Sequence, residues 1–267
     1  MYRPNTLKQR IARGEKVYGS WSVLGSPFAT QVICEAGFDF IIIDHEHGIG
    51  DHMSLGVQLL ALESSPTVAL VRVPRMEGNY MRRVLDLGAA GLVTPSVETA
   101  DEARRIVDWC RYPPHGNRGA APGTIRASGF GVRAKEYAAT ANDNVLLAVQ
   151  IETVEGVRNA AEIAAVDGID MIFIGPYDLS ASAGVMGQMS HPGVVKMIES
   201  VEQAAKVAGK SLGSVLWPGK SLGDMYERGY ALISSGSDAS RLHDACVADI
   251  RRFRQAVGLP VDPDQAD

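Results

Sequence analysis

Residues 38–44 read FDFIIID, and residues 171–175 read MIFIG. Both stretches are short, are apolar at nearly every position, and end at an aspartate or a glycine. A strand has this composition when both of its faces are covered, as happens in parallel sheets with helices packed against them. These two segments therefore predict a parallel sheet inside an α/β protein.

On either side of these segments, eight short strand patterns alternate with eight longer helical patterns. The expected strands are Val17–Leu24, Phe38–Asp44, Thr67–Val73, Gly91–Pro95, Val145–Glu152, Met171–Gly175, Ser211–Leu216 and Ala231–Ser235. The expected helices are Ser26–Ala36, Met53–Glu63, Gly78–Leu87, Ala100–Arg111, Val154–Ala164, Gly193–Ala208, Gly219–Arg228 and Ser240–Val257. Eight such units in about 250 residues are typical of a closed (β/α)8 TIM barrel.

A doubly wound sheet is the alternative arrangement. Such a sheet usually has a glycine-rich phosphate turn after its first strand, whereas residues 23–27 read VLGSP. No linker-like tract divides the chain, so we expect a single barrel domain over residues 1–267, with a tail at about 259–267. The proline- and glycine-rich stretch Tyr112–Asn144 interrupts the alternation, and we expect a long irregular loop there that is functional or disordered.

The composition limits the possible functions. The 267 residues are 46% hydrophobic and 21% charged, with a formal net charge of −5, which is ordinary for a globular protein and unlike a nucleic-acid binder. No window approaches the length of about 18 uninterrupted apolar residues that a membrane span needs. Residues 1–16 are too polar for a signal peptide, and Cys34, Cys110 and Cys246 have no disulfide or metal spacing. We expect a cytoplasmic protein with these cysteines buried in helices.

Polar side chains gather where the expected strands end, which is where barrels place their active sites. These ends carry Asp44 to His47, Arg72, Gln150 with Glu152, Gly175 to Asp178, and Leu216. Glu152 and Asp178 follow neighbouring strands, and two close carboxylates repel each other unless a proton or a cation lies between them. A hard divalent cation such as Mg2+ is the simplest solution, because it binds one or two protein carboxylates and fills its other positions with water and substrate. The alternative for both carboxylates is a role as the N-cap or as a first-turn charge of the next helix.

The other strand ends indicate anion binding and proton transfer. Arg72 suits the bidentate binding of a carboxylate, and its alternative is an ion pair with Asp44 or Glu98. His47 suits proton transfer near neutral pH, whereas His45 is as consistent with a structural hydrogen bond. No expected strand ends in lysine, which disfavours a Schiff-base mechanism and leaves a metal ion to stabilise an enolate.

Several motifs together resemble those of the HpcH/HpaI family of metal-dependent (class II) pyruvate aldolases. In particular, they are similar to the 4-hydroxy-2-oxoheptane-1,7-dioate and 2-keto-3-deoxyglucarate aldolases. The motifs are AGFDFIIIDHEHG (36–48), VRVP (71–74), VLDLGAAGLVTPSVETADEA (84–103), RYPPHGNRG (111–119), VQIETVEGV (149–157) and FIGPYDLSASAG (173–184). The resemblance implies a (β/α)8 barrel that binds Mg2+, Mn2+ or Co2+ and cleaves or forms 4-hydroxy-2-oxo acids through a pyruvate enolate. It also implies oxaloacetate decarboxylation as a side activity.

The resemblance also implies roles for individual residues. Glu152 and Asp178 correspond to the metal ligands, Arg72 to the keto-acid-binding residue, and His47 to the acid/base histidine. Asp86 corresponds to the carboxylate that a neighbouring subunit supplies to that histidine, since family members are commonly homo-hexamers. The expected substrate-binding residues are Trp21, Gln150, Gly175, Pro176 and Leu216.

The sequence departs from the family pattern at four positions. His45, His115, Tyr177 and Trp217 differ from the residues that are frequent there, and we expect them to line the region that takes the aldehyde. Two other functions fit the chain: a citrate-lyase-β-like or malyl-CoA-type carbon–carbon lyase, and a non-catalytic keto-acid-binding protein. The partners expected are pyruvate and an aldehyde, without nucleic acid or membrane.

Overall fold

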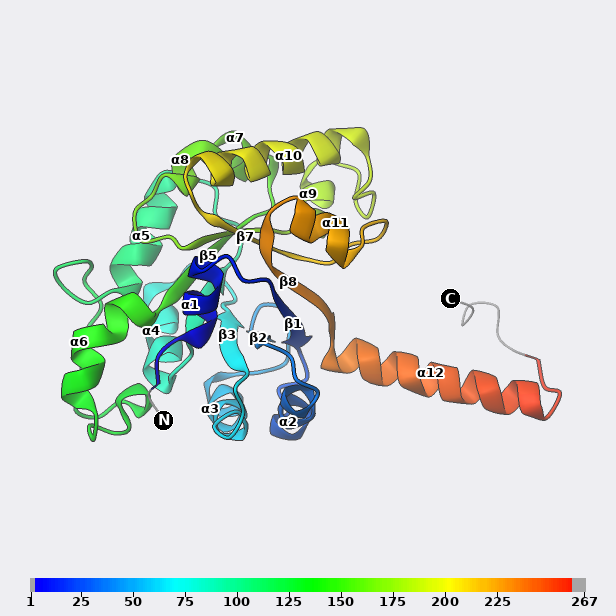
Figure 1. Cartoon of the computed structure of the whole chain (residues 1–267), viewed down its shortest axis with the longest axis horizontal. Coiled ribbons are helices and arrows are strands. Elements are labelled where there is room, and N and C mark those ends of the chain that lie inside the picture. Colours follow the sequence, from blue (N-terminus) through cyan, green and yellow to red (C-terminus); the bar gives the residue numbers. More distant parts are fainter. Residues whose placement is uncertain (1–2, 261–267) are drawn as a thin grey trace.

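The computed structural model describes residues 3–260 and contains a closed barrel of eight parallel strands, each beside its neighbours in sequence (Figure 1). The strands are β1 (Val17–Ser22), β2 (Phe40–Asp44), β3 (Val68–Arg72), β4 (Gly91–Thr94), β5 (Leu146–Ile151), β6 (Met171–Ile174), β7 (Ser211–Val215) and β8 (Tyr230–Ser237). Pairing of β1 with both β2 and β8 closes the barrel. The predicted barrel is confirmed, and the doubly wound alternative is wrong.

Helices surround the barrel. They are α1 (Thr6–Ala12), α2 (Pro27–Glu35), α3 (His52–Ala61), α4 (Gly78–Leu87), α5 (Ala100–Cys110), η1 (Arg126–Ser128), α6 (Ala134–Asn144), α7 (Val154–Arg158), α8 (Ala160–Ala164), α9 (Pro176–Ser182), α10 (Pro192–Val207), α11 (Leu222–Glu227) and α12 (Asp238–Ala256). The sequence did not predict α1 or α9, and the helix expected over Val154–Ala164 is divided at Asn159. None of the helices in the described range is long and apolar enough to cross a membrane.

The interruption before β5 is only partly irregular. It contains the short helix η1 and the three-turn helix α6, so the expectation of a continuous loop over Tyr112–Asn144 is wrong. Because α6 buries only Tyr137 and Ala141, its sequence lacks the repeating apolar stripe by which a helix is recognised.

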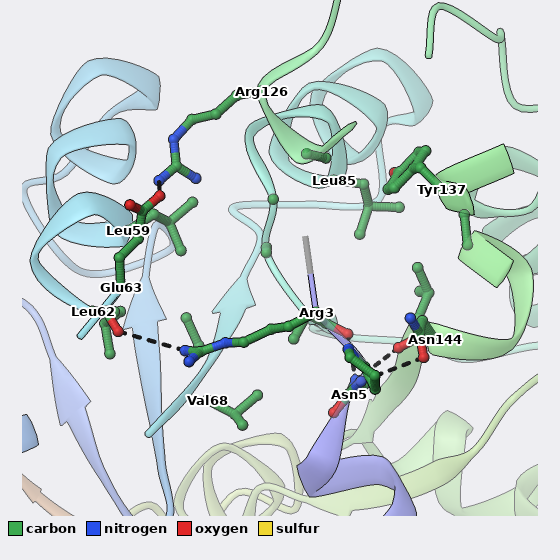
Figure 2. Close-up of a pocket in the computed structure, with 18 of the residues that line it drawn as sticks. Arg3, Asn5, Leu59, Leu62, Glu63, Val68, Leu85, Arg126, Tyr137 and Asn144 are labelled. Carbon is green, nitrogen blue, oxygen red and sulfur yellow. Dashed lines mark hydrogen bonds and ion pairs between the residues drawn. The ribbon is translucent and has the colours of Figure 1, made fainter. Parts of the chain in front are cut away.

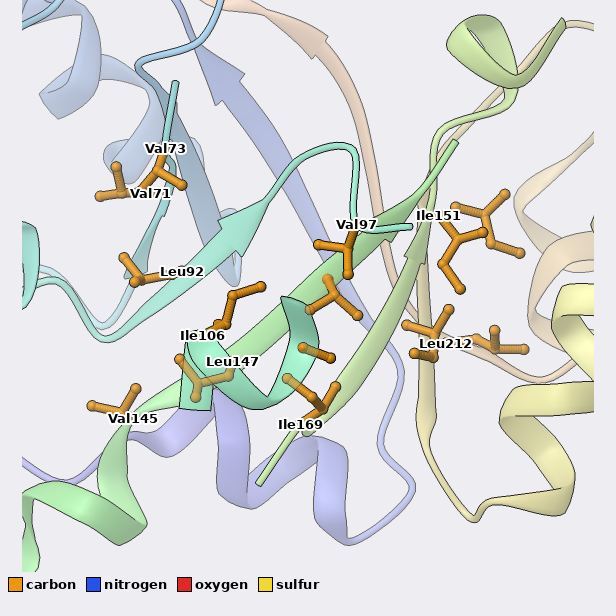
Figure 3. Packing of buried hydrophobic residues seen from close by; sticks show 14 of the residues in the cluster. Val71, Val73, Leu92, Val97, Ile106, Val145, Leu147, Ile151, Ile169 and Leu212 are labelled. Carbon is orange, nitrogen blue, oxygen red and sulfur yellow. The ribbon is translucent and has the colours of Figure 1, made fainter. Parts of the chain in front are cut away.

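The strands alternate between two hydrophobic layers. Phe40 and Ile42 of β2 belong to the cluster inside the barrel, whereas Ile41 and Ile43 belong to the cluster between the strands and the helices. Figure 3 shows part of this outer cluster, with side chains from β3, β4, β5 and β7 packed beneath the helices. The alternation continues through the end of β2, so the side chain of Asp44 points inward and that of His45, the next residue, points toward the helices.

Helix α12 leaves the barrel after β8 and projects away from it (Figure 1). Asp238 is its only buried residue, and Leu242, Ile250 and Phe253 expose 61%, 48% and 58% of their surfaces. Cys246 on α12 is exposed as well, so the expectation that all three cysteines are buried holds for Cys34 and Cys110 only. Most of the expected tail, residues 261–267, lies outside the described residues.

Candidate active site

Arg72 ends β3 at the mouth of the barrel, and two acidic side chains from the end of β2 hold it there. Its Nε and Nη2 donate to the two carboxylate oxygens of Asp44 at 2.9 and 2.7 Å, and its Nη1 lies 3.0 Å from Glu46 Oε2. Burial by itself would raise the pKa of Asp44, but the hydrogen bonds from Arg72 outweigh burial and lower that pKa. The ion pair with Asp44, rather than with Glu98, is therefore the one that forms.

The contacts of Arg72 leave part of its guanidinium available. A guanidinium has five N–H donors, and Asp44 and Glu46 engage three of them, so one N–H on each Nη is left for another acceptor. The guanidinium carbon lies 4.6 Å from the centre of the Trp21 ring, whose Nε1 donates to Ser234 Oγ at 2.9 Å. Trp21 thus supports the guanidinium from inside the barrel.

Glu152 lies just past the end of β5 and is 4% exposed. Its Oε1 accepts from the backbone N–H of Ser96 at 2.8 Å, and its Oε2 accepts from Gln150 Nε2 at 2.6 Å. Ser96 has a φ of 52°, a left-handed conformation that non-glycine residues rarely adopt and that is common at functional sites. This backbone conformation allows the N–H to reach Glu152.

The acidic groups at the mouth oppose one another's ionisation. Burial raises the pKa of Glu152 to about 7, and the charges of Asp178 and Glu46 add to the rise against the lowering effect of Ser96 and Arg72. The pKa of Glu46 is also raised, mainly by burial, with Arg72 opposing the shift and Asp178 contributing to it. Asp178 lies in the first turn of α9, and the residue that caps this helix is Gly175. Asp178 is therefore not the N-cap of α9, although it does lie in the first turn as the alternative interpretation expected, and Thr153 rather than Glu152 caps α7.

The surroundings of Glu152 suit a divalent cation. The side-chain oxygen Gln150 Oε1 is buried without a hydrogen-bond partner, and such an atom is uncommon unless a water, an ion or a ligand binds it. A Cβ at Gly175 would overlap Glu152 Oε2, so only glycine fits beside this carboxylate. The described residues contain no cluster of three or more His, Cys, Asp or Glu side chains that could hold a metal. A cation here would bind through two carboxylates and take its other ligands from water and substrate, as Mg2+ commonly does.

His47 follows β2 at the barrel mouth, whereas Asp86 lies in the last turn of α4, whose Leu85 and Gly88 lie near the other end of the barrel. The side chain of His47 is 68% exposed, with its Nε2 4.0 Å from Glu46 Oε2. Asp86 lies on α4 and accepts from Arg118 Nη2 at 2.6 Å. A contact between the two predicted partners would therefore have to form between chains.

The substrate-binding residues expected from the sequence fall into two groups. Trp21, Gln150 and Gly175 contact Arg72 or Glu152, or lie against them, and Pro176 is buried at the start of α9 beside Gly175. Leu216 instead packs against the outer cluster between strands and helices, so the structure does not bring it to this group.

The four departures from the family pattern do not all face the mouth. Trp217 is 4% exposed and packs against Tyr230 in the outer cluster, and His45 points toward the helices. His115 lies beside Arg104 and Arg105 of α5. The expectation that these three line the aldehyde region is wrong, whereas Tyr177 is 48% exposed and next to Asp178.

Sequence reasoning missed Glu46 and Ser96. Glu46 lies two residues after Asp44 in the acidic segment that follows β2, and this position directly after a strand end is a signal that could have revealed it. Ser96 contributes a backbone N–H through an unusual φ, for which the sequence offers no such signal.

A cavity of about 270 Å³ lies at the other end of the barrel (Figure 2). It is lined by apolar side chains such as Leu59 and Leu85, and the Arg126–Glu63 ion pair and the Arg3 contact with the Leu62 carbonyl cross its edge. Barrel active sites form at the opposite end, so we do not place the chemistry there.

A family model described as HpcH/HpaI aldolase/citrate lyase matches residues 18–245. This chain belongs to the HpcH/HpaI family. Among its curated relatives, a 5-keto-4-deoxy-D-glucarate aldolase of Salmonella paratyphi C is 42% identical and covers 88% of this chain and 91% of its own length. A hydroxypyruvate/pyruvate aldolase of Roseobacter denitrificans is 41% identical and covers 77% of this chain and 81% of its own length.

A solved HpcH/HpaI family structure from Burkholderia cenocepacia has the same architecture. It superposes with a TM-score of 0.89 at 38% identity and covers 94% of this chain and 99% of its own chain. The resemblance seen in the sequence motifs is confirmed, and it extends over the whole barrel of this HpcH/HpaI family member.

Proposed function

We propose that this HpcH/HpaI family member is a pyruvate aldolase that cleaves 4-hydroxy-2-oxo acids to pyruvate and an aldehyde, and forms them in reverse. The observation that supports this most directly is the buried Glu152, with a pKa of about 7, among the charges of Arg72, Glu46 and Asp178 at the barrel mouth. The names of the two aldolase relatives support the same reaction class.

Glu152 and Asp178 would hold the divalent cation, Mg2+, Mn2+ or Co2+. When bound, it supplies a Lewis acid that offsets the charge of the 2-oxo acid and its enolate. Gln150 and Ser96 orient the Glu152 carboxylate, because each donates a hydrogen bond to a different oxygen. The unpartnered Gln150 Oε1 is available to a water or a substrate hydroxyl.

Arg72 contributes the two N–H donors that Asp44 and Glu46 leave available. These donors stabilise the negative charge that develops on the keto oxygen during cleavage, and the loss of one such donor costs about 3 kcal/mol in comparable sites. The bidentate grip of Asp44 fixes the guanidinium before substrate binds, so little reorganisation is needed.

Proton transfer falls to His47. In cleavage it takes the proton of the C4 hydroxyl while the C3–C4 bond breaks. The electron pair of that bond passes into the enolate, the aldehyde leaves, and a proton added at C3 yields pyruvate. Asp86 of a neighbouring subunit would orient His47, since the two residues lie apart within one chain.

This division of the site requires an assembly, and we propose a homo-hexamer. The projecting α12 supports an assembly, because its exposed Leu242, Ile250 and Phe253 form an apolar surface that its own barrel does not cover. Helix α2 adds Phe28 and Val32, which are 79% and 70% exposed.

The decisive experiment measures pyruvate released from a 4-hydroxy-2-oxo acid, for example 5-keto-4-deoxy-D-glucarate, by coupled lactate dehydrogenase. We expect release by the enzyme with Mg2+ or Mn2+, loss after EDTA, and recovery on adding metal back. Full activity in a metal-stripped sample would contradict the roles of Glu152 and Asp178. Cleavage of a CoA thioester in place of the oxo acid would favour the citrate-lyase-type alternative.

A further inference from the structure

Tyr80 of α4 contacts both ends of the loop that carries Glu46 and His47. His45, at the start of the loop, places its Nδ1 2.7 Å from the Tyr80 hydroxyl. His52, at the start of α3 beyond the loop, packs its ring against the Tyr80 ring with the centroids 4.3 Å apart. The segment between these two contacts, residues 46–51, is therefore held at both ends by one side chain from another helix.

The loop is also compact between its ends. The backbone N–H groups of Glu46 and His47 donate to Asp44 Oδ1 at 3.0 and 3.3 Å, and Ile49 N–H donates to the Val23 carbonyl at 3.0 Å. A Cβ at Gly50 would lie 3.3 Å from the His45 ring, so the far side of the loop folds back onto that ring. Movement of His45 would thus be transmitted to the whole segment.

Packing alone does not explain why histidines occupy positions 45 and 52 beside Tyr80. Both His45 Nε2 and His52 Nε2 are buried without a hydrogen-bond partner, an arrangement that opposes folding and that apolar side chains would avoid. Burial lowers the pKa of each imidazole, and mutual repulsion lowers the pKa of His45 further. A neutral His45 suits a hydrogen bond with the Tyr80 hydroxyl, because either group can then donate or accept that bond.

We propose that Tyr80 is a positioning residue that grips His45 and His52 and so fixes residues 46–51 with His47 at the barrel mouth. The inference rests on the proposed function, because that function gives His47 the hydroxyl proton. Arg72 depends less on Tyr80, since Asp44 binds two of its nitrogens independently of the loop and only its Nη1 contact with Glu46 involves a loop residue. The grip should accordingly affect proton transfer more than enolate stabilisation.

Two reactions of the same enzyme separate these effects. Cleavage of a 4-hydroxy-2-oxo acid requires removal of a hydroxyl proton. Decarboxylation of oxaloacetate breaks the bond from C3 to the departing CO2, sends its electron pair into the same enolate, and involves no hydroxyl proton. In Tyr80→Phe we expect kcat for cleavage to fall about 10-fold through misplacement of His47. We expect KM, the pyruvate dissociation constant and the decarboxylation rate to change by less than about twofold.

Variants of His45 test the hydrogen bond itself. His45→Phe keeps a ring but removes the bond, and we expect the same selective loss of cleavage. The double variant Tyr80→Phe/His45→Phe should be no slower than either single variant, because the two groups act as one pair. His45→Asn restores a polar atom near the Nδ1 position and should recover part of the cleavage rate.

Tyr226→Phe is the matched control. Its hydroxyl donates to the Val17 carbonyl at 3.2 Å at the opposite end of the barrel, so it loses a similar hydrogen bond without touching the loop. Equal losses of cleavage and decarboxylation in Tyr80→Phe, or unchanged cleavage, would overturn the positioning role. Additive losses in the double variant would do the same. If the wild-type enzyme released no pyruvate at all, the proposed function would fail first and the role of Tyr80 with it.

Discussion

The two ends of this barrel differ in how completely their polar and charged side chains are paired. At the amino-terminal end, Arg126 donates to the Leu87 carbonyl and to Glu63, and Arg3 donates to the Ser65 carbonyl. Asn5 Nδ2 likewise donates to two backbone carbonyls at 2.8 Å. These polar groups surround a cavity of about 270 Å³, and each has a partner from the protein itself.

At the mouth, carboxylates lie near one another and one buried polar atom has no hydrogen-bond partner. Burial raises the pKa values of Glu152 and Glu46, the charge of Asp178 adds to both shifts, and Gln150 Oε1 is buried without a hydrogen-bond partner. Burial of opposed carboxylates lowers the stability of a protein unless something binds them. The comparison teaches that the presence of a cavity does not by itself indicate the candidate active site here, whereas incomplete polar pairing does.

The largest expected effect tests this comparison by changing one arginine at each end, Arg72 at the mouth and Arg126 at the amino-terminal end. Arg72→Lys should lower kcat/KM for cleavage about 100-fold, equivalent to about 2.7 kcal/mol, because a point charge cannot keep the Asp44 grip and also direct two donors at the keto oxygen. Steady-state kinetics with coupled pyruvate detection measures this loss.

Arg126→Lys is the control at the amino-terminal end. It also removes a guanidinium that bonds to a carboxylate and a carbonyl, but we expect unchanged kinetics and only a small fall in thermal stability. Equal kinetic losses in the two variants would mean that the ends of the barrel do not differ in the way described.

The next effect separates groups within the mouth. His47→Ala should lower kcat for cleavage by about 10²-fold, the lower end of the usual range for a general acid/base, while pyruvate affinity in the presence of Mn2+ changes little. His115→Ala removes an exposed imidazole far from the strand ends and should behave as the wild type. Wild-type rates in His47→Ala would remove His47 from the mechanism.

The sequence predicted the barrel well because its strands are continuous apolar runs. FIII in β2 and MIFI in β6 are buried at every position, so their pattern has few alternative interpretations. The sequence failed at α6, whose buried face consists of Tyr137 and Ala141 alone after a tract of prolines and glycines.

The candidate site was predictable only where a charged residue stands at a strand end, in the position at which barrels place their active sites. Arg72 and Glu152 stood out for this reason, whereas Ser96 acts through a backbone N–H in a left-handed conformation that no residue type announces. Leu216 was misplaced because a shift of one residue at the end of β7 moves a side chain from the lumen to the helices: Val215 packs inward and Leu216 outward.

The smallest expected effect concerns the free energy of unfolding, and it tests whether the charge of Glu152 at the mouth lowers stability when no cation is bound. Without metal, folded protein keeps the Glu152 proton up to about pH 7, whereas the unfolded chain releases it near the ordinary value of 4.5. The raised pKa contributes stability that is fully present below the unfolded value and is lost as the pH rises through the folded value. Glu152→Gln has no such proton to lose, so its stability relative to the wild type should increase by about 2 to 3 kcal/mol from about pH 5 to about pH 8.

Urea denaturation in EDTA at both pH values measures this difference, and other titrating groups cancel because they are common to the two proteins. Parallel pH profiles for wild type and Glu152→Gln would contradict the raised pKa. Adding Mn2+ at the higher pH should stabilise the wild type and leave the variant nearly unchanged, because binding to the folded state alone raises its stability. Such a result would mean that a cation supplies at the mouth the pairing that the amino-terminal end obtains from its own side chains.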